Sequence, residues 1–243
     1  MRARLAQYGA EVVVHGSHWA EAHEQALSLC RGGGGAMIHP FEGETTWTGH
    51  GTLVAEIQRQ LPRIAAQAGY NTLPPGGPGC ILLSVGGGGL LMGALAGCEA
   101  AGWSQTAVIA VETLGADSLA RAVAARSLVT LPGITSIASS LGAPQVSASA
   151  LDACLQPGSR VTPLVVSDAA AVDACLQFLD DHRMLVEPAC GAALAPVYRA
   201  QGSGGAMPEA LKTAASVVVI VCGGSNVKHG DLVKWQASLP RTE

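Results

Sequence analysis

The chain has 243 residues, of which 49% are hydrophobic and 13% charged, and its formal net charge is −4. A chain of this length and composition buries a core without disulfides or metals, so a disordered polymer is excluded. The mild negative charge and the 4% of aromatic residues argue against nucleic-acid binding, which needs a basic field or stacked rings. Length alone predicts one or two domains.

The first part of the chain alternates strand-like and helical patterns. Short apolar runs predict strands at 11–14 and 36–38, and a run rich in Ala, Glu and Gln predicts a helix at 19–30. From Thr48 the apolar positions keep helical spacing, which predicts one long amphipathic helix. The Pro- and Gly-rich stretch at 70–79 predicts a surface loop.

The remainder of the chain repeats strand and helix patterns in turn. Runs of apolar residues predict a buried strand at 80–85 and further strands at 107–111, 161–166 and 216–221. Between them, helical patterns occur at 90–102, at 117–125, after a cap at Ser167 or Asp168, and from Glu187 onward. Apolar strands that alternate with helices are typical of a parallel sheet covered on both faces. We therefore predict an α/β fold that binds its ligand beyond the carboxyl ends of the strands.

The cysteines and the chain ends bear on the cellular compartment. The seven cysteines lie far apart and form no CxxC pair, so we interpret them as buried thiols in a reducing compartment and predict no zinc site. The N-terminus has no apolar stretch of the signal-peptide type, and the longest apolar run, at 214–222, is too short to cross a bilayer. These features predict a soluble, cytoplasmic protein without membrane or nucleic-acid partners.

Two tetraglycine runs occur in the sequence. Gly32–Gly35 follows a predicted helix and is interpreted as a connector. Gly86–Gly89 follows a strand and opens a helix, where backbone N–H groups and the helix N-terminus favour a phosphate; the alternative is a tight turn that only packs helix on strand. A Walker loop is excluded because Leu90 stands where that loop needs lysine. A dinucleotide site with Glu112 as the ribose-binding acid fits the glycine spacing poorly.

A set of longer motifs indicates the protein family more specifically than the glycine runs do. In chain order they are PFE at 40–42, WTGHGTLV at 47–54, SVGGGGLL at 84–91, VETLGADS at 111–118, LVTLPGITS at 128–136, MLVEPACGAAL at 184–194 and VCGGSN at 221–226. Over nearly the whole chain these motifs resemble the serine dehydratase and threonine deaminase family, whose members use pyridoxal phosphate (PLP) and have the tryptophan-synthase-β fold, PLP fold type II. The resemblance implies PLP as cofactor and the large PLP-binding domain of that fold.

The resemblance also implies roles for single residues. The cofactor phosphate would be held by the backbone N–H groups of Gly86, Gly87, Gly88, Gly89 and Leu90. Cys222, followed by Gly223, matches the position whose thiol or hydroxyl faces the pyridine nitrogen, and a thiol there would leave the ring largely neutral, which suits a β-elimination. Ser140 matches a position that packs against the ring. The alternatives are a buried small hydrophobe for Cys222 and a plain loop serine for Ser140.

A monovalent-cation site, usually for potassium, is implied in the same way. Its carboxylate would be Glu112, and its carbonyl oxygens would come from Gly86, Ala116, Leu141 and Ala143. One carboxylate among carbonyls suits a hard cation of single charge. The alternative for Glu112 is a capping or salt-bridged side chain. Glu187 is interpreted first as a favourable charge at a helix N-terminus, with a catalytic role as the alternative.

The family chemistry requires a lysine that forms a Schiff base with PLP, in a Ser-x-Lys-x-Arg-Gly motif near the N-terminus. This sequence contains neither that motif nor the Ser-Ser-x-Gly-Asn-type substrate loop, and we assign the role to none of Lys212, Lys228 and Lys234. We therefore expect no catalytic residue in this chain and a segment of roughly a hundred residues missing in front of it. Residues 1–40 would be the remnant of a small domain and residues 41–243 the large PLP-binding domain.

Two functional hypotheses follow. In the first, the chain is part of a PLP-dependent ammonia-lyase that converts L-serine to pyruvate and L-threonine to 2-oxobutanoate, with release of ammonia. In the second, it is a catalytically inactive truncated isoform that binds PLP weakly or pairs with a full-length subunit. The resemblance further implies a homodimer, and it leaves the preference between serine and threonine open.

Overall fold

The structure is a computed structural model that describes residues 2–16, 19–33, 35–69, 76–200 and 207–240. Contacts between residues divide the chain into two units, Met1–His39 and Pro40–Glu243. Two sequence predictions lie partly outside the described residues: the connector at Gly32–Gly35 and the surface loop at 70–79.

The unit Met1–His39 carries two described helices, α1 (Arg2–Gln7) and α2 (Trp19–Gly33). Helix α2 confirms the helix predicted at 19–30. The strands predicted at 11–14 and 36–38 are wrong, because neither segment pairs with another strand among the described residues. An apolar run becomes a strand only when a neighbouring strand supplies its backbone hydrogen bonds.

The unit Pro40–Glu243 is built on a parallel sheet. Its strands are β1 (Cys80–Ser84), β2 (Ala107–Thr113), β3 (Val161–Val166) and β4 (Val217–Val219). Their order across the sheet is β3-β2-β1-β4, and every neighbouring pair is parallel. This arrangement confirms the predicted α/β fold class. The last strand is shorter than the prediction of 216–221.

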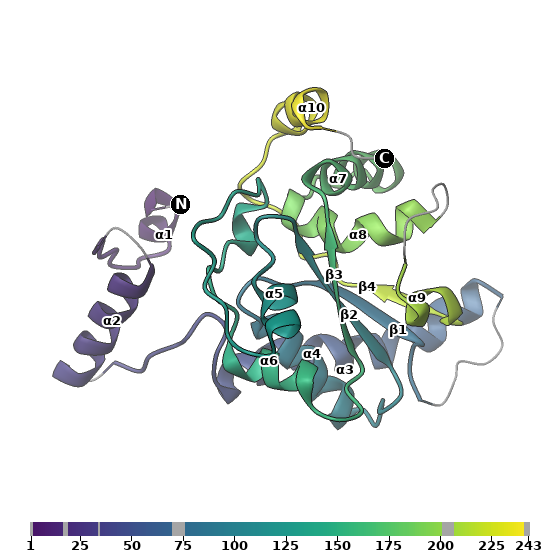
Figure 1. Cartoon of the computed structure of the whole chain (residues 1–243), viewed down its shortest axis with the longest axis horizontal. Helices are drawn as coiled ribbons and strands as arrows, with labels where there is room; N and C mark the ends of the chain where they lie inside the picture. Colours follow the sequence, from purple (N-terminus) through teal and green to yellow (C-terminus); the bar gives the residue numbers. More distant parts are fainter. Residues whose placement is uncertain (1, 17–18, 34, 70–75, 201–206, 241–243) are drawn as a thin grey trace. The chain divides into compact units, whose positions relative to one another are not determined.

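Helices cover both faces of the sheet (Figure 1). One face packs against α3 (Glu44–Gln67), α4 (Gly89–Ala100), α5 (Ser118–Ala125) and α6 (Ala148–Leu155). The other packs against α7 (Asp168–His182), α8 (Pro188–Ala200), α9 (Glu209–Thr213) and α10 (His229–Ser238). Within the described ranges, no helix has both the length and the apolar character needed to cross a membrane.

The central strand β1 explains why both helical layers are needed. Its side chains alternate between the two cores: Leu82 belongs to the core of α7 and α8, while Ile81 and Leu83 belong to the core of α3 and α4. Successive side chains of a strand point to opposite faces, so a strand buried on both faces is apolar throughout. All five residues of β1 are buried, the apolar run Cys80–Leu83 as predicted and also the polar Ser84 at its end.

Helices α3 and α4 cross so closely that their backbones touch. A Cβ atom on Gly97 would lie 2.7 Å from the carbonyl oxygen of Gly51 and 2.8 Å from the Cβ atom of Val54. None of these atoms sits at the flexible end of a long side chain. A residue larger than glycine at position 97 would therefore push the two helices apart.

We expect Gly97→Ala to lower the free energy of unfolding by about 1–3 kcal/mol, the usual cost of overpacking a core. Helix propensity acts in the opposite direction, by up to about 1 kcal/mol for this exchange. Gly49→Ala on α3 is the matched control and should stabilise the protein, because a Cβ atom there meets nothing within 4 Å. Urea unfolding measures both values. A Gly97→Ala protein as stable as the unaltered chain would contradict the close crossing.

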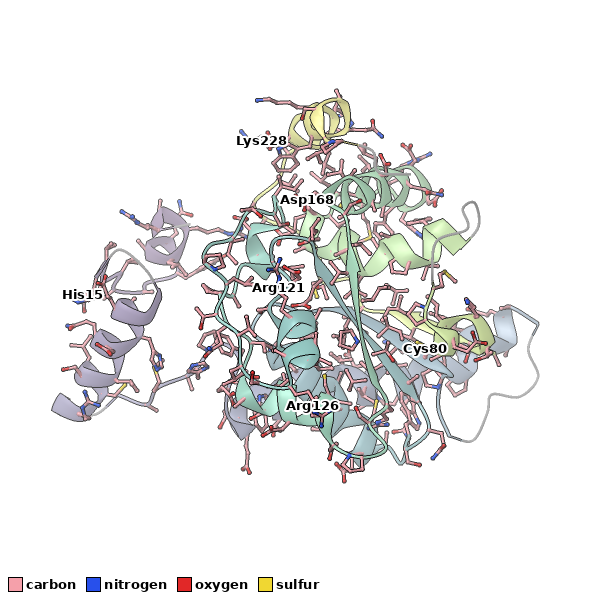
Figure 2. All side chains as sticks on the ribbon, viewed as in Figure 1. His15, Cys80, Arg121, Arg126, Asp168 and Lys228 are labelled. Carbon is pink, nitrogen blue, oxygen red and sulfur yellow. The ribbon has the colours of Figure 1, made fainter. Side chains whose placement is uncertain are left out.

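The strand order also locates the ligand side of the sheet. Strand β1 pairs with β2 on one side and with β4 on the other. In open parallel sheets, ligands bind where the order of the strands reverses, beyond their carboxyl ends. Ser84 at the end of β1 lies at this edge of the sheet, and so does Asp168, which opens α7 directly after β3 (Figure 2).

Candidate functional site

A cavity of about 400 Å³ lies beyond the ends of β1 and β4. Its lining consists of Ser84, Ser140, Leu141, Glu187, Ala189, Cys190, Cys222, Gly223, Gly224 and Ser225. A cavity of this size holds a small molecule or a cofactor. The structure thus brings three of the predicted cofactor residues together, namely Ser140, Cys222 and Gly223, and adds Leu141 from the predicted cation site.

The tetraglycine Gly86–Gly89 lies beside this cavity and is not part of its lining. A Cβ atom on Gly86 would lie 3.2 Å from both Cα and the carbonyl oxygen of Leu141, which does line the cavity. Gly88 is the N-cap of α4 and has a φ angle of 101°, a left-handed conformation that favours glycine. The loop therefore passes from β1 into α4 along the Leu141 side of the cavity.

The N–H groups of this loop have no partner among the residues that the structure describes. In the described part of the chain, the backbone N–H groups of residues 86–91 donate no hydrogen bond to another residue. Gly88, Gly89 and Leu91 are nevertheless buried, and buried N–H groups are normally paired. Because unpaired N–H groups at a helix N-terminus attract anions, these residues fit a phosphate group.

Packing against Phe41 also constrains the loop. A Cβ atom on Gly87 would collide with the Phe41 ring, and one on Gly89 would lie 2.7 Å from the Phe41 Cα atom. Glycine at these two positions is thus required by packing alone. Such packing is compatible both with a phosphate site and with the alternative of a tight turn.

Cys222 follows β4, and its side chain is exposed where it lines the cavity. This exposure contradicts the alternative that Cys222 is a buried small hydrophobe. The neighbouring protein still withholds enough water to raise the pKa of the thiol, and the nearby Cys190 and Glu187 raise it further. Near neutral pH the group facing the cavity is therefore a protonated thiol.

Glu187 precedes α8 and holds the turn that follows β4. Its backbone N–H donates to the carbonyl of Gly223 at 3.1 Å, and its Oε2 atom accepts from the N–H of Ser225 at 3.3 Å. A Cβ atom on Gly224 would lie only 2.6 Å from the Glu187 nitrogen, so the turn wraps tightly around this residue. The carboxylate therefore bonds to the turn, and Glu187 both precedes α8, as its first interpretation expects, and lines the cavity.

Within Pro40–Glu243, alkylation is expected to modify Cys222 at least about tenfold faster than the buried Cys80, Cys98, Cys175 and Cys190. The thiolate is the reactive form and the pKa of Cys222 is raised, so the rate should keep rising beyond pH 9. Quenched alkylation followed by mass spectrometry of the peptides measures this. Cys222→Ser should remove the fast site, and equally fast labelling of Cys80 would contradict the burial of β1.

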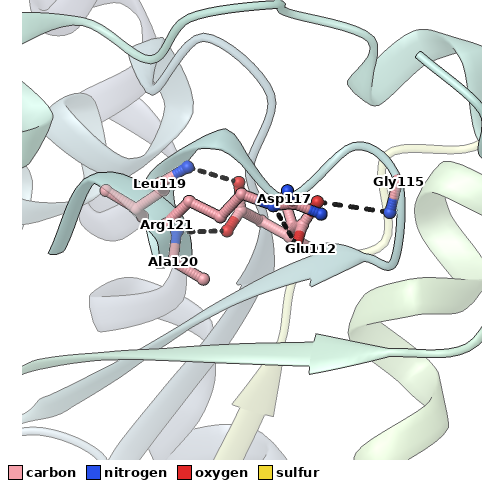
Figure 3. Close-up of polar contacts among 6 residues, drawn as sticks. All are labelled: Glu112, Gly115, Asp117, Leu119, Ala120 and Arg121. Carbon is pink, nitrogen blue, oxygen red and sulfur yellow. Dashed lines mark hydrogen bonds and ion pairs between the residues drawn. The ribbon is translucent and has the colours of Figure 1, made fainter. Parts of the chain in front are cut away.

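Glu112 ends a different strand, β2, and is completely buried. Figure 3 shows its two carboxylate oxygens accepting the N–H groups of Leu119 and Ala120, each at 2.8 Å, in the first turn of α5. The pKa of this carboxyl is raised to about 7, chiefly because burial disfavours its charged form; the two hydrogen bonds oppose this rise, and the charge of Asp117 adds to it. The capping interpretation of Glu112 thus has direct support. Because the pKa is still raised, the two capping hydrogen bonds do not fully offset the free-energy cost of burying the charged carboxylate.

The start of α5 holds a second unusual group. Ser118 is buried, and its hydroxyl has no hydrogen-bond partner within the described ranges. The neighbouring Asp117 is occupied, because it accepts from the N–H of Gly115 at 3.2 Å and pairs with Arg121 at 2.9 Å (Figure 3). An unpaired buried hydroxyl two residues from a predicted carbonyl ligand, Ala116, is an oxygen that a cation could use. Ser118 is the last residue of the motif at 111–118, but nothing in the sequence indicated this role for it.

The other predicted cation residues lie in three segments: the loop after β1, the turn after β2 and residues 141–143. Gly86 abuts Leu141, as described above, and the N–H of Ala143 donates to the Leu141 carbonyl at 2.7 Å. Ala116 is buried in the turn after β2. Among the residues that the structure describes, no three His, Cys, Asp or Glu side chains cluster as potential metal ligands. A site made of one carboxylate and several carbonyls is of a different type.

Comparisons with known proteins agree with this architecture. The family model for pyridoxal-phosphate dependent enzymes matches residues 1–223. A human serine dehydratase-like protein is 45% identical over 94% of this chain and 65% of its own length. Human L-serine dehydratase/L-threonine deaminase is 42% identical over 98% of this chain and 69% of its own length. The chain therefore spans about two thirds of the length of the curated relatives that it matches.

A solved structure supports the same relationship. The crystal structure of a fungal L-serine ammonia-lyase from Rhizomucor miehei superposes with a TM-score of 0.79 at 33% identity, covering 98% of this chain and 70% of that one. The sequence resemblance is thereby confirmed, together with PLP fold type II. The chain belongs to the pyridoxal-phosphate dependent enzymes, and within them to the serine dehydratase and threonine deaminase family.

Proposed function

We propose that this chain supplies the phosphate-, ring- and cation-binding residues of a PLP-dependent L-serine/L-threonine dehydratase. The observation that carries the proposal is the set of unpaired N–H groups at residues 86–91, next to a cavity of about 400 Å³. A free phosphate site beside a pocket of cofactor size is the arrangement that a phosphorylated ring cofactor needs. Residues 41–243 would form the PLP-binding domain and residues 1–40 part of a small domain.

The names of the relatives suggest the reaction. They include an L-serine dehydratase/L-threonine deaminase and an L-serine ammonia-lyase. The corresponding reactions here would convert L-serine to pyruvate and ammonia, and L-threonine to 2-oxobutanoate and ammonia. Bound PLP would supply an electron sink for the loss of the Cα proton and the Cβ hydroxyl. The chain's own residues would bind and orient that group.

Each cofactor residue has a stated task in this proposal. The N–H groups of Gly86–Gly89 and Leu90 would donate to the phosphate oxygens. The thiol of Cys222, with Gly223 beside it, would face the pyridine nitrogen, and Ser140 would pack along the ring. A protonated thiol is a weak hydrogen-bonding group without charge, so it would leave the ring nitrogen largely unprotonated. A neutral ring would be a weaker electron sink than a protonated one, which suits a β-elimination.

A monovalent cation, for which potassium is the choice, is part of the same proposal. Glu112 would offer its buried carboxylate, Ser118 its unpaired hydroxyl, and the carbonyl oxygens would come from Gly86, Ala116, Leu141 and Ala143. A bound cation would offset the buried negative charge and satisfy the hydroxyl at once. It would also join the loops after β1 and β2 to the segment that contains Leu141.

The lysines do not enter this site. Lys212 lies on α9 and pairs with Glu209 at 3.6 Å, Lys228 is the exposed N-cap of α10, and Lys234 is exposed on the same helix. None of the three lines the cavity. We therefore assign the Schiff-base role to no residue of this chain and expect the chain alone to release no pyruvate from L-serine. A homodimer is the assembly that we propose.

The experiment is a titration of the purified chain with PLP, in which binding is monitored through the quenching of tryptophan fluorescence. PLP should bind, inorganic phosphate should compete with it, and pyridoxal without phosphate should bind at least about a hundredfold more weakly, since the phosphate provides charge-assisted hydrogen bonds. Equal affinity for PLP and pyridoxal would contradict the phosphate site. Borohydride reduction should label no lysine stoichiometrically, and labelled Lys228 with serine-dependent pyruvate release would overturn the assignment of the lysines.

A further inference from the structure

Asp168 is the first residue of α7, and it uses its carboxylate away from its own helix. The N-cap of α7 is Ser167, whose side chain accepts from the N–H of Ala170 at 3.2 Å. Asp168 instead accepts from the hydroxyl of Ser136 at 2.6 Å through Oδ1 and from the N–H of Ile137 at 3.0 Å through Oδ2. These partners lie 32 and 31 residues away in the sequence, so they do not serve to cap the helix.

Ser136 is the centre of this network. Its Oγ atom donates to Asp168, because an ionised carboxylate only accepts, and it also accepts from the N–H of Ala138 at 3.0 Å. The buried hydroxyl of Thr113, at the end of β2, lies 2.8 Å from the same oxygen, and with the Ser136 proton already used it acts as the donor. The ends of β2 and β3 thus hold one short segment at several points.

We propose that Asp168 is a positioning residue of the cofactor and cation site, which sets the place of residues 136–143 through Ser136 and Ile137. The inference rests on the proposed function, since it concerns how well that site is formed. Asp168 itself is not part of the cavity lining. It would act only through the segment that it holds.

The segment leads directly into the site. Ala138 accepts the N–H of Leu141 at 2.8 Å and so starts the short 3-10 turn η1 (Ser139–Leu141). Ser140 and Leu141 of this turn line the cavity. On its other side, Leu141 touches the tetraglycine so closely that a Cβ atom on Gly86 would lie 3.2 Å from it. A shift at Ser136 would therefore reach the cavity wall and the proposed phosphate loop without slack to absorb it.

The test compares Asp168→Asn with the unaltered chain. An amide replaces one acceptor by a donor that faces the N–H of Ile137 or the hydroxyl of Ser136, so at least one hydrogen bond is lost. Amide hydrogen exchange across residues 136–143, measured without any ligand, should become at least about tenfold faster. The dissociation constant for PLP should rise at least about tenfold. The KCl concentration that gives half-maximal stimulation of PLP binding should also increase.

Two further variants keep the test sharp. Asp173→Asn is the control, because this aspartate lies on the same helix and accepts from Gln236 of α10 at 3.0 Å, away from the cavity. Ser136→Ala removes only the central hydroxyl; it should repeat the effect of Asp168→Asn, and the double variant should be no worse than either single one. Ser136→Ala alone serves as the test if Asp168→Asn does not fold.

The outcomes separate the inference from the proposed function. Unchanged exchange at residues 136–143 in Asp168→Asn would overturn the inference, and so would faster exchange with PLP affinity and KCl dependence within about twofold of the unaltered chain. If the unaltered chain binds no PLP, the proposed function fails. The ligand-free exchange data then still decide whether Asp168 sets the segment.

Discussion

Gly88→Ala is expected to weaken PLP binding at least about a hundredfold, or about 2.7 kcal/mol. Gly88 has a φ angle of 101°, where an L side chain is strained by roughly 1–2 kcal/mol. Its Cβ atom would also lie 2.7 Å from Cβ of Ala150 and 3.0 Å from Oγ of Ser147. Both effects push the loop away from α6, so that the N–H groups of Gly86–Gly89 no longer converge. Fluorescence titration with PLP measures the loss.

The matched control separates backbone strain from the loss of the site. Gly102 also has a positive φ angle, of 72°, but a Cβ atom there meets nothing within 4 Å. Gly102→Ala should therefore cost about 1 kcal/mol of stability and leave PLP affinity unchanged. Undiminished PLP affinity in a folded Gly88→Ala protein would show that this loop does not bind the phosphate.

The free energy of unfolding is expected to fall by up to about 3 kcal/mol between pH 5 and pH 8 when the only salt is choline chloride. The cause is Glu112, whose pKa rises from its ordinary value of 4.5 to about 7 on folding, chiefly through burial. The folded protein holds this proton where the unfolded chain has released it, so stability decreases as the pH rises through this range. In KCl the decrease should be smaller, because a cation beside the carboxylate favours its ionised form.

Urea unfolding across pH in both salts tests this expectation. Glu112→Gln removes the titrating group, so the fall in stability should disappear and the two salts should give one curve. Glu99→Gln, on the exposed side of α4, should change neither curve. A fall of equal size in KCl and choline chloride would contradict the cation site, whereas no fall in either salt would contradict the raised pKa of Glu112.

The fold class could be predicted because it follows from local patterns. A run such as 80–83 is apolar at every position because both faces are covered, and the helices between such runs cover them. The segments 11–14 and 36–38 show the limit of this reasoning, since their composition suits a strand while no described partner pairs with them. Strand β4 is short and partly exposed at the edge of the sheet, where the apolar run continues beyond the pairing.

The candidate site was only partly predictable. The positions of Cys222 and Gly223 were marked by a glycine-rich motif and that of Ser140 by the family resemblance alone, and the three meet at one cavity. Ser118 ends one of the family-like motifs without any sign of its own role, and Asp168 belongs to none of them. Their importance depends on an unpaired hydroxyl in one case and on a partner 32 residues away in the other. Local sequence contains neither kind of information, because both arise from tertiary packing.

The pairing of β1 with β4 has a consequence for how the site is made. Strands β1 and β4 come from distant parts of the chain. Directly before them, the N–H of Gly79 donates to the hydroxyl of Ser216, which lies 137 residues away in the sequence. Contacts between residues so far apart in the sequence form slowly, because closing the long loop costs entropy before the contacts can stabilise the fold. On the ribosome, the tetraglycine emerges well before the Cys222 turn. The cavity that both flank therefore cannot be completed until synthesis has passed Cys222.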